Sequence, residues 1–188
     1  LLEKYKGLHE WIQEYIKHLI KKEVSNNTLT SYVIDLKYFE KFIKERFNID
    51  IPEVTEEHII QYQLYMRNKN WASGTRARKT ITIKDFYEFA SKKFQTGNPA
   101  KEIITPKIEK RKPKFLTKQE VQKLLDATKT KNEPFRSRDR LIILLFATVG
   151  LRVGELVKIK LTDLNSGFLR VTGKRNKERV IKLFQFLI

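Results

Sequence analysis

A glycine–leucine–arginine corner near the end of the chain carries residue types that suit a phosphate site. Residues 148–156 read Thr-Val-Gly-Leu-Arg-Val-Gly-Glu-Leu and follow an apolar run at 141–147. Gly150 interrupts that run, so Arg152 is expected to be held at a helix end, with Glu155 orienting it. A guanidinium offers a rigid fork to two phosphate oxygens and stays charged at any working pH. The alternative is an ordinary surface ion pair between Arg152 and Glu155 at i,i+3 spacing.

A second group of cations follows on a polar stretch that resembles a hairpin turn. Residues 172–179 read Thr-Gly-Lys-Arg-Asn-Lys-Glu-Arg. If neighbouring cations and partial burial lower its pKa, the Lys174 ammonium can enter a minor groove and protonate a leaving oxygen. Arg175 and Lys177 on the same turn are candidate DNA contacts. The alternative is a solvated turn, because exposed turns often carry such residues.

Basic and hydroxyl side chains also gather at two expected helix starts in the first half of the chain. Helix N-termini that carry such residues suit phosphate contacts, and exposed side chains beyond them can reach base edges. The alternative is a solvated helical face. The candidate DNA-binding residues are Thr28, Ser31, Thr75, Arg76, Arg78 and Lys79.

The overall charge agrees with a polyanionic partner. The 188 residues carry a formal net charge of +17, with an isoelectric point near 9.9. Such an excess favours nucleic acid first and an acidic membrane second, although a lysine-rich composition can also serve solubility alone. There is no cysteine, and the three histidines have no metal-ligand spacing, so we expect no metal and no cofactor.

No apolar run approaches the roughly 20 residues that span a bilayer, and the start of the chain lacks a signal-peptide pattern. We therefore expect a soluble, cytoplasmic protein without a membrane partner.

The elements that must position these residues fall into two domains. Apolar residues recur at helical spacing through residues 8–20 and 29–43, after Thr55, and through 77–94, so residues 1–100 are predicted to be all-helical. Residues 101–114 are basic and contain two prolines, which predicts a linker that is semi-extended at those prolines. Lys112 and Lys114 in this linker are further candidate DNA contacts.

The second domain is predicted to span residues 115–188. Thr117 and Glu120 form a capping box at its start. Residues 141–147 predict a helix buried on all sides, and a short helix should follow through Glu155. Residues 168–171 and 180–183 are short β-strand candidates joined by the polar turn.

With these boxes in this order, the chain resembles the tyrosine recombinase (phage integrase, Xer-type) family. The resemblance runs through nearly the whole chain, and it favours the functional interpretation of Arg152 and Lys174 over the alternatives. Its motifs lie at residues 28–36, 98–100, 116–121, 137–141, 150–156, 161–164, 171–174 and 177–180. The implied fold is mainly α: a helical-bundle core-binding domain (SAM-like), followed by the first part of a mixed α/β catalytic domain with a small β-sheet.

The resemblance also implies an activity. In that family a tyrosine hydroxyl attacks a DNA phosphate and forms a 3′-phosphotyrosyl link without metal. Arg152 would stabilise the charged transition state with Glu155 as its support, and Lys174 would act as general acid. The two domains would clamp double-stranded DNA, the linker would follow its backbone, and the full-length protein would act as a tetramer.

One part of the family pattern is missing. A His-x-x-Arg box and the nucleophilic tyrosine should follow the lysine, but all seven tyrosines precede Arg152, so no nucleophile is assigned. We expect a chain that ends before its nucleophile and is inactive by itself. The alternative is a natural non-catalytic regulator that occupies recombination sites. The sequence leaves open whether the role is chromosome-dimer resolution or the integration of a phage or mobile element.

Overall fold

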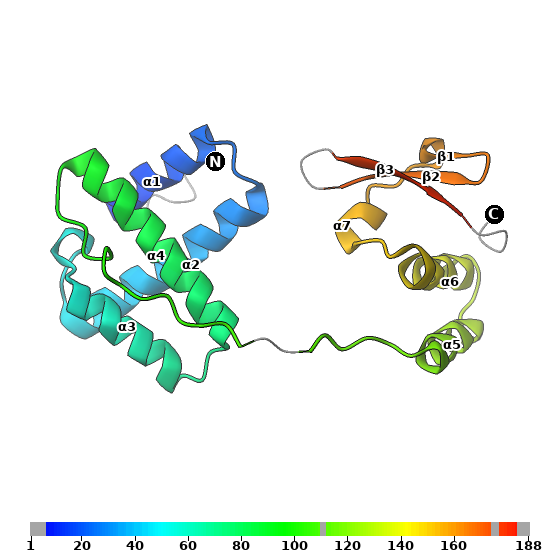
Figure 1. The fold of residues 1–188 in the computed structure, drawn as a ribbon, viewed down its shortest axis with the longest axis horizontal. Coiled ribbons are helices and arrows are strands. Elements are labelled where there is room, and N and C mark those ends of the chain that lie inside the picture. Colours follow the sequence, from blue (N-terminus) through cyan, green and yellow to red (C-terminus); the bar gives the residue numbers. More distant parts are fainter. Residues whose placement is uncertain (1–6, 110–111, 174–176, 184–188) are drawn as a thin grey trace. The chain divides into compact units, whose positions relative to one another are not determined.

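A computed structural model describes residues 7–109, 112–173 and 177–183. The chain divides into two compact units, Leu1–Arg111 and Lys112–Ile188, and each is described by itself. The predicted fold class is confirmed, because the chain is mainly helical and has one small antiparallel sheet (Figure 1).

The first unit is a bundle of four α-helices. Ser25 starts α2 by accepting a hydrogen bond from the backbone N–H of Thr28 at 3.2 Å, and α2 and α4 both end in a left-handed residue. These helices are α1 (Glu10–Lys21), α2 (Asn26–Phe47), α3 (Glu56–Asn68) and α4 (Ser73–Phe94), with a 3-10 turn, η2 (Ile51–Glu53), between α2 and α3.

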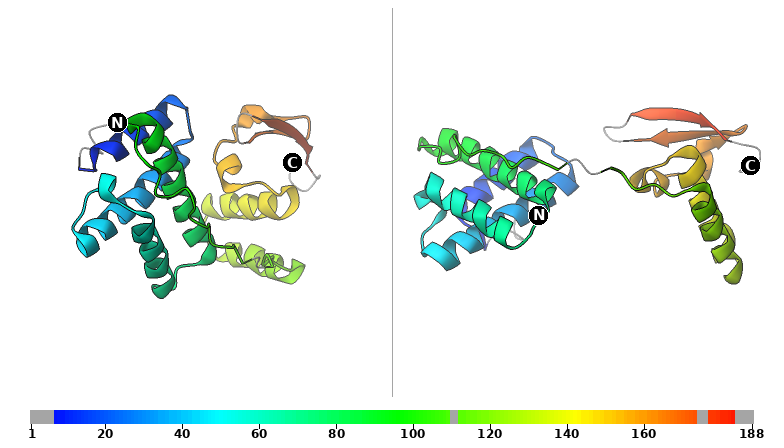
Figure 2. Two further views of the ribbon diagram at one scale, coloured as in Figure 1. Left: turned by 60° about the vertical axis from the view of Figure 1, so that its left-hand side comes forward. Right: turned by 60° about the horizontal axis from the view of Figure 1, so that its bottom comes forward.

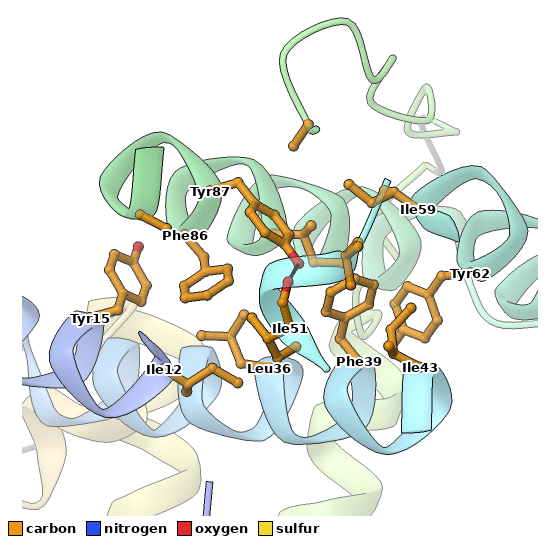
Figure 3. Packing of buried hydrophobic residues seen from close by; sticks show 14 of the residues in the cluster. Ile12, Tyr15, Leu36, Phe39, Ile43, Ile51, Ile59, Tyr62, Phe86 and Tyr87 are labelled. Carbon is orange, nitrogen blue, oxygen red and sulfur yellow. Dashed lines mark hydrogen bonds between the residues drawn. The ribbon is translucent and has the colours of Figure 1, made fainter. Parts of the chain in front are cut away.

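Aromatic side chains form much of the core of this bundle (Figure 3). Phe39 from α2 meets the ring of Tyr62 from α3 edge-on, with centroids 5.2 Å apart. Tyr87 from α4 donates a hydrogen bond from its hydroxyl to the carbonyl of Ile51 at 3.0 Å, which fixes η2 to the bundle. Each ring is nearly inaccessible to solvent. Such burial stabilises a unit of this size more than any single polar contact.

The first unit continues past residue 100. Ile103 is buried in the core, the Gln63 side chain donates to the carbonyl of Ile104 at 2.9 Å, and the N–H of Glu109 donates to the Ser73 hydroxyl at 3.2 Å. Part of the predicted linker therefore packs against α3 and α4 through Ile103 and these two hydrogen bonds. Residues 103–109 have no helix or strand, as expected for a linker, but this stretch is attached to the first unit.

The second unit combines short helices with a three-stranded antiparallel sheet of order β1-β2-β3. The two strand candidates of the sequence correspond to β2 and β3, in which Val171 lies opposite Arg179. The elements are α5 (Lys118–Ala127), η3 (Thr128–Thr130), α6 (Phe135–Leu144), η4 (Leu145–Val149), α7 (Val153–Leu156), η5 (Leu161–Asp163), β1 (Leu164–Asn165), β2 (Phe168–Thr172) and β3 (Glu178–Lys182).

The capping box at the start of α5 forms as predicted. The Thr117 hydroxyl accepts from the N–H of Glu120 at 3.3 Å, and the N–H of Thr117 donates to the Glu120 carboxylate at 2.7 Å. This reciprocal pair satisfies two backbone donors that a helix start otherwise leaves unpaired.

The apolar run at 141–147 differs from its prediction. Regular α-helix ends at Leu144, and a π-helical turn, η4, carries the chain to Val149. Leu145 is buried, whereas Leu141 is 46% exposed. Only one face of the run packs on the small core of Leu145, Leu151, Leu169, Val171 and Leu183, so burial on all sides was wrong for the described part of this unit. Figure 2 shows the strands lying over α7 and the end of α6.

Candidate functional site

The Gly150 corner is built by a change of backbone conformation. Gly150 ends the helix in the left-handed region, with φ at 65° and ψ at 37°. A glycine adopts this conformation without the steric cost that a Cβ adds. Arg152 follows in extended backbone as the N-cap of α7, and its N–H donates to the Glu155 carboxylate at 2.8 Å. Arg152 is therefore held at a helix boundary.

Glu155 is the centre of the site. Its side chain is 4% exposed and accepts hydrogen bonds from two arginines. Arg152 donates through Nη1 at 3.0 Å, and Arg179 donates through Nη1 and Nη2, each at 3.0 Å. The hydrogen bond from the backbone of Arg152, together with those from the two guanidinium groups, lowers the pKa of Glu155 to about 2. The carboxylate is ionised at neutral pH.

The prediction did not include Arg179 as a site residue. A signal was present, because Arg179 lies opposite Val171 in the register of β2 and β3, and Val171 is buried. Side chains of directly opposed residues share one face of a sheet. A charged residue opposite a buried valine therefore needs a partner on that face, and Glu155 supplies it.

Gly173 allows the hairpin to approach this carboxylate. A Cβ at Gly173 would lie 3.3 Å from Oε1 of Glu155 and 3.4 Å from the carbonyl oxygen of Lys177. The N–H of Gly173 also donates to that carbonyl at 2.7 Å, which closes the base of the turn. A Cβ at this position would crowd the Glu155 carboxylate, which would have to shift by a few tenths of an ångström.

The site is open on the side of Arg152, whose side chain is 79% exposed. A cavity of about 610 Å³ lies against it. The predicted residues Arg152, Glu155 and Lys177 all line this cavity, whereas Lys174 and Arg175 lie outside the described residues. The remaining lining residues are Gly154, Lys158, Thr172, Gly173, Glu178 and Arg179.

On the first unit, the predicted DNA contacts come from the first two turns of two helices, α2 and α4. The Tyr32 hydroxyl on α2 donates to Asp85 on α4 at 3.0 Å, and Asp35 on α2 binds Arg78 earlier on α4, where the two helices cross (Figure 1). Thr28, Ser31, Thr75 and Arg76 are partly exposed, and Arg78 is exposed.

Lys79 was predicted to contact DNA, but the structure places it in the interior of the first unit. Its side chain is 5% exposed, and its ammonium binds the fully buried Asp35 at 2.9 Å. The same carboxylate also accepts from Arg78 and from the Thr82 hydroxyl. A position near the start of a helix does not show whether a side chain faces the core or the solvent. Here Lys79 faces the core and neutralises the buried Asp35.

Lys112 and Lys114 are both exposed in the segment that leads to α5. Within residues 7–109, 112–173 and 177–183, no group of three or more His, Asp or Glu side chains could hold a metal ion. No helix in this described part of the chain is long and apolar enough to cross a membrane.

Two models of one protein family match the chain. The "Phage integrase, N-terminal SAM-like domain" matches residues 12–93, and the "Phage integrase family" matches residues 114–188. Similar curated proteins include tyrosine recombinase XerC of Natranaerobius thermophilus, which is 36% identical over 172 residues. Tyrosine recombinase XerD of Staphylococcus epidermidis is 37% identical over 178 residues. These matches cover 89% and 92% of this chain but only 57% and 59% of the relatives, so the chain spans less than two thirds of their length.

Solved structures show a similar fold. A lambda integrase (75–356) dimer bound to a COC′ core site matches with a TM-score of 0.77 and 23% identity, over 93% of this chain and 62% of that chain. XerH site-specific recombinase bound to a palindromic difH substrate matches with a TM-score of 0.66 and 20% identity, over 95% and 55%. The two family models, which together match most of the chain, show that it belongs to the phage integrase family.

Proposed function

We propose that the chain is the DNA-binding and arginine-bearing part of a site-specific DNA recombinase, which cuts and rejoins strands through a 3′-phosphotyrosyl intermediate. The observation that carries this proposal is the buried Glu155 carboxylate, which holds Arg152 at a helix boundary while leaving its guanidinium open to a cavity. Similarity to XerC and XerD supports the same reaction class. A DNA substrate would place the protein in the cytoplasm.

The geometry gives each residue a distinct role. The exposed end of Arg152 would bind the non-bridging oxygens of the scissile phosphate, where negative charge grows during attack. Glu155 would position Arg152 without neutralising the site, because Arg179 balances the charge of that carboxylate. Lys174 would give a proton to the departing 5′ oxygen. No tyrosine follows Arg152 in this chain, so the nucleophile would come from another part of the whole protein.

The rest of the charge would hold the duplex. Contacts from the first unit and the segment before α5 would neutralise phosphates and fix the register of the protein on DNA. Lambda integrase has been solved as a tetramer bound to a Holliday junction, and we propose a tetramer on DNA for the intact protein. The proposed DNA contacts are Thr28, Ser31, Thr75, Arg76, Arg78, Lys112, Lys114, Arg175 and Lys177.

Duplex binding and covalent trapping test the proposal together. Each phosphate neutralised by this +17 chain should release counterions, so log affinity should fall linearly and steeply with log salt. The intact gene product should also form a covalent adduct with a nicked duplex of its target site. A flat salt slope would contradict DNA binding. Tight binding by the intact product without any adduct would favour the non-catalytic regulator instead.

A further inference from the structure

An aromatic cavity lies on the first unit, separate from the arginine corner. Its volume is about 390 Å³, which is within the range of small-ligand pockets, about 300–1,000 Å³. It is lined by five aromatic rings and three charged side chains: Tyr38, Phe42, Tyr62, Tyr65, Trp71, Lys41, Glu45 and Arg46.

The rings form a continuous wall drawn from α2, α3 and the segment before α4. Tyr38 and Trp71 meet edge-on with centroids 6.1 Å apart. Trp71 also meets Tyr65 at 6.2 Å, and Tyr65 meets Phe42 at 4.9 Å. Tyr38 is 54% exposed, whereas Phe42 is buried. The wall therefore has a fixed inner side and an accessible rim.

Cations lie over four of these rings. The Lys79 ammonium is 4.6 Å from the centroid of Tyr38 and 5.0 Å from that of Trp71. Arg46 lies 5.9 Å from the ring of Phe42, and Lys69 lies 5.9 Å from that of Tyr65. Because Lys79 is anchored to the buried Asp35, its charge stays beneath the rings.

The charge of the rim favours an anion. Glu45 is the acidic residue of the lining, and its carboxylate pairs with Lys41 at 3.5 Å. Arg46 adds a further positive charge beside the rings. Aromatic rings with cations beside them match a ligand that has both a π-face and a phosphate.

We propose that this cavity binds one unpaired nucleobase of DNA by stacking, while Lys41 and Arg46 contact the phosphate next to it. In a duplex, both faces of a base are covered by its neighbours, so only an unpaired base can enter. An acidic peptide would match the positive charge of Lys41 and Arg46 but would leave the aromatic rings without a stacking partner. The inference rests on the proposed function, because a strand that is cut and rejoined to a new partner must unpair and pair again.

Trp71 provides a reporter within the cavity. The chain has two tryptophans, and Trp11 stacks on Phe94 instead, with centroids 4.5 Å apart. Trp11→Phe keeps that stack and leaves Trp71 as the fluorophore. The probes are an oligothymidylate of about 10 nucleotides, an abasic oligonucleotide of equal length and a perfect duplex. We expect saturable quenching by oligothymidylate, and weak or no quenching by the abasic strand.

Substitutions at Tyr38 separate stacking from charge. Tyr38→Ala should weaken oligothymidylate binding about 5- to 150-fold, the range for loss of one base–aromatic stack. Tyr38→Phe should retain binding, because the ring remains. Phe135→Ala is the matched control, since Phe135 is also 54% exposed and lies 5.0 Å beneath Arg138, but in the other unit.

Two results would overturn the inference. One is equal affinity and quenching for the abasic and thymidine strands, which needs no substitution and so does not depend on folding of a variant. The other is unchanged oligothymidylate binding by folded Tyr38→Ala. Either result, with duplex binding intact, leaves the proposed function standing. Loss of duplex binding in the unsubstituted chain would instead count against the proposed function.

Discussion

Arg179 and Glu155, 24 residues apart in the chain, form a two-point ion pair in which Nη1 and Nη2 each donate to one carboxylate oxygen at 3.0 Å. The pair joins β3 to α7, and the backbone and side chain of Arg152 bind the same carboxylate. A parallel fork of this kind fixes orientation as well as distance. The position of Arg152 therefore depends, through Glu155, on Arg179 of β3.

Replacing Arg179 should disturb the site more than its exposure suggests. Arg179→Ala leaves the buried Glu155 with one arginine instead of two, so we expect a lower thermal midpoint and slower DNA cleavage by the intact protein. Arg179→Lys should recover little, because an ammonium cannot form the fork. Arg170→Ala on the neighbouring strand is the control and should leave both readouts near wild type. Equal effects of the two alanine substitutions would refute a positioning role for Arg179.

Acid should remove the stabilisation that Glu155 provides. Its pKa falls from an ordinary value of 4.5 to about 2 in the folded chain. A carboxyl whose folded pKa is depressed stabilises the fold above its unfolded pKa, and this contribution is lost as pH falls through the folded value. The denaturant midpoint of the wild type should therefore exceed that of Glu155→Gln above pH 4.5, and the gap should shrink toward pH 2. A gap independent of pH would contradict this role of the charge.

Gly173 should tolerate a methyl group poorly. In Gly173→Ala the new Cβ would press on the Glu155 carboxylate, which three backbone and guanidinium donors hold in place. We expect reduced cleavage by the intact protein and a lower melting temperature. Gly97→Ala is the control, because its Cβ would meet nothing within 4 Å and it does not line the cavity beside Arg152. Wild-type behaviour of Gly173→Ala would show that the hairpin can move away from Glu155 without cost.

Lys79 should matter for folding rather than for DNA affinity. Lys79→Met removes one of the two cations that bind the buried Asp35. Breaking a buried pair costs about 3–5 kcal/mol, and the remaining Arg78 should reduce this to about 3 kcal/mol, measurable by urea unfolding. The salt slope of duplex binding should not change in the folded fraction. Lys37→Met on the exposed face of α2 is the control, and a loss of stability of the same size there would contradict the assignment.

The sequence predicted elements better than it predicted which side chains face inward. Helical spacing of apolar residues gave the bundle, and the Thr117 box gave the start of α5, because both signals are local. Lys79 was misplaced because its partner Asp35 is 44 residues away and no local pattern reveals it. The burial expected for 141–147 failed for a related reason, since hydrophobicity does not state which faces of a helix have a neighbour.

At the candidate site too, local features were predicted and contacts between distant residues were not. The glycine break and the i,i+3 spacing were sufficient to place Arg152 beside Glu155. Arg179 was missed because its role depends on strand register, which becomes visible only when β2 and β3 are paired. Lys174 and Arg175 lie outside the described residues, so their roles stay predictions.

The central claim is that Arg152 acts on the scissile phosphate and does not merely bind DNA. The direct test compares wild type with Arg152→Ala in the intact gene product, using a nicked duplex that traps the covalent intermediate. Duplex affinity should change little, because the chain has many other cations. Covalent adduct should fall by about 100-fold or more, as for loss of one donor to a developing oxyanion. Normal accumulation of the adduct by Arg152→Ala would contradict the account.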